Sequence, residues 1–169
     1  VADSLSYDVN TLYETFYNPD ESAYQEFQKL QKKLDLDYGK NTTAQGNALE
    51  KLVKEIFNQI NGVKCTNDVK TKTNQFDCTA FCGIKPVTLS VFDFLTPYFI
   101  IECKNEPGKK LNNTYCNKLM SIMETNAAQL GIIFGRKKAT SPCFTIAREH
   151  YLTNKNSTQQ QIIITCADD

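Results

Sequence analysis

The sequence has little of what zinc, membrane and secreted proteins require. It contains one histidine (His150) and no Cys-x-x-Cys pair among its seven cysteines, so the clustered Cys and His ligands of a zinc site are missing. No stretch approaches the roughly 18 consecutive apolar residues that a membrane span needs, and residues 1–8 lack the basic and apolar regions of a signal peptide. These absences favour a cytoplasmic protein whose reduced thiols fill core space and which does not enter a membrane.

The chain also lacks a net charge, because 19 acidic residues balance 19 lysines and arginines. The distribution is uneven: residues 1–40 hold eight acids and four bases, whereas residues 61–118 hold eight bases and five acids. If the protein binds a polyanion, the middle of the chain is therefore the expected face. A length of 169 residues is enough for one domain with a sizeable core.

Periodicity predicts a succession of helices followed by strands that alternate with helices. We expect helices at residues 4–16, 20–36, 48–60, 113–129 and 143–154. We expect strands at residues 63–73, 74–82, 96–104, 130–136 and 160–167, with 87–92 as either a strand or an insertion. Asp20, after Asn18-Pro19, is the expected N-cap of the second helix.

This order indicates an α/β protein with a mixed central sheet. The first strands form an antiparallel meander, and the later strands are joined through helices, which makes them parallel neighbours covered on both faces. We expect a three-layer fold with an extra N-terminal helical segment, divided into a helical extension at 1–40 and a core at 41–169.

Charged residues at the end of an apolar strand are the first functional signal. In the segment YFIIECKN (98–105), Glu102 and Lys104 follow four apolar residues. Residues two apart on a strand share a face, so Glu102 and Lys104 stand together while Cys103 points into the opposite side. The alternative is a solvated Glu–Lys pair where the strand reaches the surface.

Two further acids can join this pair. Asp77 lies on the preceding meander strand and converges with Glu102 if the two strands pair. Glu50 lies at the margin of the apolar stripe of the helix at 48–60, where it can reach inward or extend to water. Carboxylates suit Mg²⁺, which polarises a phosphoryl group and activates water, and a neighbouring lysine stabilises developing charge.

Together, the FDC segment (76–78), IIECKN (100–105), the following helix and GIIFGR (131–136) resemble the PD-(D/E)XK nuclease superfamily. The closer resemblance is to its Mrr-like and Holliday-junction-resolvase-like branches, and GNALEKLVKEIF (46–57) resembles their opening helix. The resemblance spans roughly residues 45–150 and implies a restriction endonuclease-like fold. It also implies a metal-dependent DNA endonuclease that uses Mg²⁺ or Mn²⁺.

The resemblance also implies roles for individual residues. Asp77 and Glu102 would bind the metal together with the backbone carbonyl of Cys103, and Glu50 would bind or tune it through water. Lys104 would be the catalytic lysine, and Lys118 would occupy an auxiliary, nucleic-acid-binding position on the next helix.

Asp93 is an alternative metal ligand, because the interval between Asp77 and Glu102 is long and contains it. We favour Asp77, since its NQFD setting resembles the family motif. No proline precedes it, which departs from the pattern that names the superfamily.

Basic residues follow two of the strands whose ends should border the site. These candidates for gripping DNA phosphates are Lys109, Lys110, Arg136, Lys137 and Lys138. The alternative is that they are solvated loop residues. One metal site cuts one strand, so a double-strand break predicts a homodimer or two recruited copies.

Other classes of function remain open at this stage. A nucleic-acid-binding or assembly module of the same fold without turnover is one alternative, and a structural domain with a Glu102–Lys104 ion pair is another. The missing initiator methionine and the end soon after a strand favour a piece of a larger multidomain restriction, defence or mobile-element protein.

Overall fold

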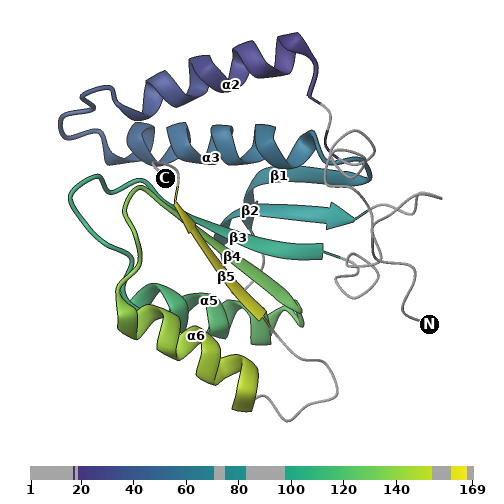
Figure 1. Ribbon diagram of the computed structural model, residues 1–169, viewed down its shortest axis with the longest axis vertical. Coiled ribbons are helices and arrows are strands. Elements are labelled where there is room, and N and C mark those ends of the chain that lie inside the picture. The colour runs from purple at the N-terminus through teal and green to yellow at the C-terminus, as the bar shows by residue number, and fades with distance from the viewer. Residues whose placement is uncertain (1–16, 18, 71–74, 83–97, 154–160, 167–169) are drawn as a thin grey trace, which may run out of the picture.

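The computed structural model describes residues 17, 19–70, 75–82, 98–153 and 161–166, which form four helices and five strands (Figure 1). The predicted helix at 4–16, the segment at 87–92 and Asp93 lie outside these residues. In the described part of the chain, no helix is long and apolar enough to cross a membrane.

Two helices precede the sheet, and side-chain caps determine where they begin. Helix α2 (Glu21–Leu34) starts after Asp20, whose carboxylate accepts a hydrogen bond of 2.8 Å from the N–H of Ala23, which confirms the predicted N-cap. Helix α3 (Thr42–Asn58) is longer than expected, because Asn41 caps it and the polar segment before Ala48 is its first turns rather than a loop.

The five strands form one mixed sheet in the order β1-β2-β3-β4-β5. The strands are β1 (Val63–Lys70), β2 (Gln75–Cys82), β3 (Tyr98–Lys104), β4 (Leu130–Gly135) and β5 (Gln161–Cys166). The pairs β1–β2 and β2–β3 are antiparallel, and the pairs β3–β4 and β4–β5 are parallel. The predicted mixed α/β sheet is therefore confirmed.

The crossover helices α5 (Asn113–Thr125) and α6 (Ser141–Thr153) cover one face of the sheet, and α3 covers the other, with α2 outside it (Figure 1). Helix α5 ends before the predicted residue 129, because Asn126 caps it and Ala127 adopts a positive φ of 53°. Helix α6 carries Pro142 in its first turn, where the missing N–H has no intrahelical partner to lose.

The hydrophobic core has two halves, one on each face of the sheet. On the α3 side the fully buried members include Leu49, Val53, Cys78, Phe99 and Ile101. On the α5 and α6 side they include Ile100, Cys116, Leu119, Met123 and Ile133. Neighbouring residues of β3 thus belong to different halves, as the alternation of a strand requires.

Two glycines of β4 allow close packing on the α5 face. A Cβ at Gly131 would lie 2.8 Å from Cδ2 of Leu119, and a Cβ at Gly135 would lie 2.8 Å from Cδ2 of Leu111. These separations are far below van der Waals contact, so α5 and the loop before it can lie this close to β4 only because both positions are glycine. The same packing brings α5 next to the end of β3.

The five cysteines at positions 65, 78, 103, 116 and 143 are free and buried. A hydrogen bond with Cys78, together with burial, raises the pKa of the Cys65 thiol well above its ordinary value. A hydrogen bond with Cys103 and burial likewise raise the pKa of Cys78. These thiols are therefore protonated core residues with little nucleophilic character, which agrees with the role expected from the sequence.

Candidate functional site

The site lies where β2 and β3 stop pairing. The ladder between these strands ends at Cys78 and Ile101. Beyond that pair, Oδ2 of Asp77 accepts a hydrogen bond of 2.7 Å from the backbone N–H of Cys103. The carboxylate thus replaces a backbone acceptor and is held against β3 by a charge-assisted hydrogen bond. A quarter of the Asp77 side chain remains exposed, at 25%, so a ligand can still reach it.

The end of β3 places Glu102 and Lys104 side by side on the α5 face. Nζ of Lys104 lies 3.1 Å from Oε2 of Glu102 and 3.5 Å from Oδ2 of Asp77. It also donates a hydrogen bond of 3.2 Å to the carbonyl of Cys103. The Cys103 side chain is buried in the core on the α3 side. The predicted shared face of Glu102 and Lys104, and the convergence of Asp77 with them, are confirmed as placements.

Glu102 is the most deeply buried charged residue of the site. Its side chain is 2% exposed, and its Oε2 receives a second ammonium group, Nζ of Lys118, at 2.8 Å. Its other oxygen, Oε1, is buried and has no hydrogen-bond partner within the described structure. An unpartnered buried carboxylate oxygen is costly, by roughly 1–3 kcal/mol or more. A ligand that bonds to Oε1 would remove that cost.

Lys104 keeps its proton in this setting. Burial alone lowers the pKa of its ammonium group, but the charges of Glu102 and Asp77 and the hydrogen bond to Glu102 outweigh burial and raise the pKa. Lys104 is therefore a cation and a hydrogen-bond donor rather than a general base. A charged donor beside two carboxylates can orient a water molecule or stabilise an oxyanion.

Glu50 belongs to α3, which covers the face of the sheet opposite to α5. It is a half-buried residue of α3, and its backbone carbonyl accepts a hydrogen bond of 3.9 Å from Sγ of Cys78, which belongs to the core on the α3 side. Asp77, Glu102 and Lys104 meet on the α5 side instead. Among the described residues, no group of three or more His, Cys, Asp or Glu side chains is arranged to hold a metal ion. The role predicted for Glu50, binding or tuning a metal through water, therefore stays a prediction.

The basic candidates lie on two neighbouring loops at the carboxyl ends of β3 and β4. The loops are joined by a hydrogen bond of 2.8 Å from the N–H of Thr140 to the carbonyl of Leu111. Four lysines are exposed there: Lys109, Lys110, Lys137 and Lys138. Lys109 pairs with Glu106 at 2.6 Å. These side chains are at the same end of the sheet as Lys104.

Arg136 differs from these lysines. Its side chain is 7% exposed, and its guanidinium donates to the carbonyl of Leu34 at 2.6 Å and to Oδ1 of Asp35 at 2.7 Å. A third contact, at 3.4 Å, reaches Oδ1 of Asn105. We therefore remove Arg136 from the candidate phosphate-binding residues, because its donors already fasten β4 to the end of α2.

Two residues beside the site were not predicted from the sequence. The hydroxyl of Tyr115 donates to Oε1 of Glu106 at 2.8 Å, and the Tyr115 ring centroid lies 5.8 Å from Nζ of Lys104. The available signal was spacing: Tyr115 precedes Lys118 by three residues on a helix, so both face the same side. Tyr115 and Glu106 form one wall beside the Lys104 ammonium group.

Comparisons with known proteins leave the site to be interpreted from its own chemistry. No family model matches the sequence, and neither a curated protein nor a solved structure matches it. The function proposed below therefore depends on the arrangement of Asp77, Glu102 and Lys104 and on the resemblance of their segments to a known motif.

Proposed function

We propose that this protein is a metal-dependent DNA endonuclease with a restriction endonuclease-like fold of the PD-(D/E)XK type. The observation that carries the proposal is the meeting of Asp77, Glu102 and Lys104 at the point where β2 and β3 separate. An aspartate from one strand and a Glu-x-Lys segment from the next are the elements that the sequence resemblance anticipates. The five-stranded mixed sheet with helices on both faces is compatible with it.

The oxygen atoms of the site suit a hard divalent cation. Asp77, Glu102 and the carbonyl of Cys103 would hold Mg²⁺ or Mn²⁺, and such ions prefer carboxylate, carbonyl and water oxygens. The buried and unpartnered Oε1 of Glu102 supports this fit. Glu50 would act from the α3 side through water. When bound, the ion polarises a phosphoryl oxygen and lowers the pKa of a coordinated water.

The protein's own residues have separate tasks in this proposal. Lys104, as an ammonium group, orients the attacking water or stabilises charge on the phosphate. Lys118 holds Oε2 of Glu102 and so fixes the direction of that carboxylate. The exposed lysines at 109, 110, 137 and 138 supply sequence-independent, salt-sensitive contacts to the phosphate backbone. The free, buried thiols are compatible with a reducing compartment such as the cytoplasm.

A second candidate function is a nucleic-acid-binding module without turnover. The observation that favours it is charge balance: Asp77 and Glu102 are matched by Lys104 and Lys118 without any further cation. A complete ion-pair network can be structural, and the described residues contain no cluster of three ligand side chains. This reading keeps the DNA contacts of the loop lysines but assigns no reaction to the site.

Nicking of supercoiled plasmid distinguishes the two functions. The endonuclease nicks DNA in Mg²⁺ or Mn²⁺, and activity is lost with EDTA and in Lys104→Ala. The matched control is Lys51→Ala, which removes an exposed lysine from the outer side of α3 and should leave nicking unchanged. DNA binding that survives Lys104→Ala, with no cleavage by any form, supports the binding module instead. Absence of both cleavage and salt-sensitive binding would reject both proposals and leave Glu102–Lys104 as a structural ion pair.

A further inference from the structure

The two edges of the sheet differ in how they are protected against pairing with another strand. Strand β1, at one edge, carries the exposed Lys64, and charged residues are a common means of preventing edge-to-edge association. Strand β5, at the other edge, reads QIIITC and carries no charge and no proline. Among the described strands, none pairs with the outer side of β5. Its outward backbone groups and apolar side chains are therefore suited to pairing.

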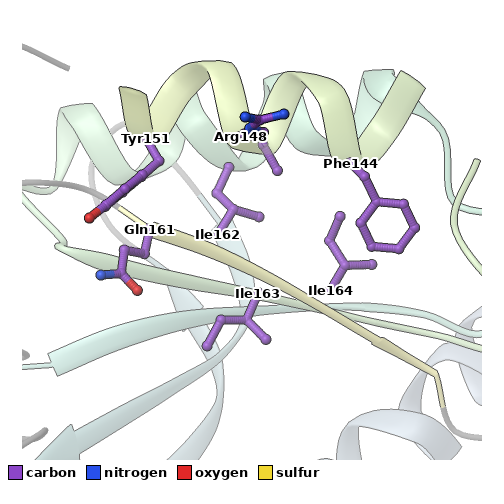
Figure 2. Close-up of a pocket in the computed structure, with 8 residues that line it drawn as sticks. Phe144, Arg148, Tyr151, Gln161, Ile162, Ile163 and Ile164 are labelled. Atoms are coloured by element: carbon purple, nitrogen blue, oxygen red, sulfur yellow. The ribbon is translucent and has the colours of Figure 1, made fainter. Parts of the chain in front are cut away.

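Both faces of β5 present apolar surface at this edge. Ile162 and Ile164 point toward α6 and pack on the core, whereas Ile163 points to the opposite face and is 47% exposed (Figure 2). On the α6 side, a groove of about 520 Å³ runs between the helix and the strand. It is lined from the helix by Phe144, Arg148 and Tyr151 (Figure 2), and Phe144 is 52% exposed.

We propose that β5 pairs antiparallel with β5 of a second copy of this chain, so that the two sheets become one. A two-fold axis perpendicular to the sheet makes two identical strands antiparallel and keeps each side chain on its own face. Directly opposite residues must share a face. An axis at Ile163 satisfies this condition: it sets Ile163 against its counterpart and Ile162 against the counterpart of Ile164.

The chemistry of the edge favours a second copy over a foreign partner. Self-pairing of an uncharged strand places no like charges opposite each other, whereas self-pairing of β1 about Lys64 would bring two ammonium groups together. The groove extends the contact to α6, whose Phe144 gains a hydrophobic neighbour across the axis. Of the described residues that line this groove, Arg148 alone is charged, and its long stem can lie on apolar surface while the guanidinium stays in water.

This interface is small, so the dimer should be weak. Six paired residues span only about 20 Å, and contacts of this size lie near the lower limit for specific interfaces. The proposal is independent of the endonuclease function. Strands of the two copies run in opposite directions, so the carboxyl ends of β3 point away from each other. The dimer therefore would not align two cutting sites at one edge of the sheet.

Sedimentation equilibrium over a wide range of protein concentration tests the dimer. The wild-type chain should change from monomer to dimer, and Ile163→Lys should weaken association by at least about tenfold, because two ammonium groups would face each other at the axis. The control is Leu36→Lys, which adds the same charge at a residue that is 58% exposed, just after α2. It should dimerise like the wild type. A wild-type chain that stays monomeric, or an Ile163→Lys chain that dimerises normally, would overturn the proposal.

A cross-linking variant tests the position of the two-fold axis at Ile163. It introduces no charge into β5, so its result does not depend on whether the Ile163→Lys chain folds. In a chain carrying Cys82→Ser and Cys166→Ser, Ile163→Cys should form a disulfide-linked dimer on mild oxidation, because its counterpart lies directly opposite. Leu36→Cys in the same background should stay monomeric. If both variants cross-link equally, or if neither does, β5 is not the contact, whatever the nicking experiment shows about the proposed endonuclease.

Discussion

The two faces of β3 are built from the same strand and have different chemistry. Toward α3, Phe99, Ile101 and Cys103 are all buried in the core. Toward α5, Ile100 is followed by Glu102 and Lys104, so the apolar pattern changes to charge within two residues. Glu102 is as deeply buried as the apolar residues around it, at 1% exposed. A buried carboxylate needs ionic partners, because burial removes its hydration. The α5 face of β3 is therefore less stabilising than the α3 face, but it holds charged groups in fixed positions.

The largest effect that we expect is a loss of nicking activity when Glu102, on the charged face of β3, is replaced. Glu102→Gln should lower the rate of plasmid nicking by about 10²–10³-fold, because a preorganised charge at the site is lost. The free energy of unfolding should change by less than about 2 kcal/mol, since the half-exposed Lys118 can return to water and Lys104 keeps Asp77 and the Cys103 carbonyl as partners. Nicking rates and urea unfolding measured on the same preparation check both parts. Normal nicking by Glu102→Gln would show that this face has no role in the reaction.

The apolar face should show the opposite pattern. Ile101→Ala removes a fully buried side chain and should lower the free energy of unfolding by about 2–5 kcal/mol. Nicking per folded molecule should stay close to wild type. The control is Ile163→Ala at the exposed edge, which should cost less than about 1 kcal/mol. Urea denaturation measures both variants, and equal losses would show that the two positions do not differ in packing.

Lys118 is expected to affect activity more than stability, because it lies outside β3 and contributes to the charged face only through its contact with Glu102. Lys118→Ala should reduce nicking by about 10-fold, as expected when a partner that orients a metal-binding carboxylate is lost. Its side chain is 50% exposed, so stability should change by less than about 1 kcal/mol. Raising the concentration of Mn²⁺ should restore part of the activity, which a merely structural role would not allow. A loss as large as that of Glu102→Gln would make Lys118 part of the chemistry itself.

The smallest effect that we expect is a change in the pH dependence of stability when Lys104 is replaced. The pKa of Lys104 is raised in the folded state above its ordinary value of 10.5. Its contribution to stability is therefore complete below about pH 10.5 and is lost as the pH rises through the folded pKa. The difference in unfolding free energy between wild type and Lys104→Met should shrink above that pH. Lys51→Met is the control, and a difference that does not depend on pH would contradict this assignment.

Much of the fold could be predicted from the sequence because the hydrophobic pattern is locally consistent. The order of strands and helices, the meander and the parallel crossovers were predicted from periodicity, and the structure confirms them. The pairing of Glu102 with Lys104 was likewise predicted, since a strand alternates with period two. Asp77 could be brought to them because strands that follow one another in the chain usually pair, even across the long interval before Glu102.

Other features depend on tertiary contacts that no local pattern encodes. The position of Glu50 relative to Asp77 and Glu102 could not be derived, because periodicity gives only the margin of a helical stripe, not the face of the sheet that the helix covers. Lys118 was predicted as an auxiliary residue only through the resemblance, and its bond to Glu102 required coordinates. The early start of α3 was missed because Asn41 is one of several polar residues that could cap a helix there.

The guanidinium of Arg136 has a consequence for where this protein can be shortened. It is a permanent charge, buried at the end of β4, and two of its acceptors belong to Leu34 and Asp35. A chain begun at residue 41 would keep the cation but lose two of its acceptors, together with Leu30 and Leu34, which belong to the core on the α3 side. Removal of the residues before Asn41 should therefore make the remaining sheet prone to unfold and aggregate.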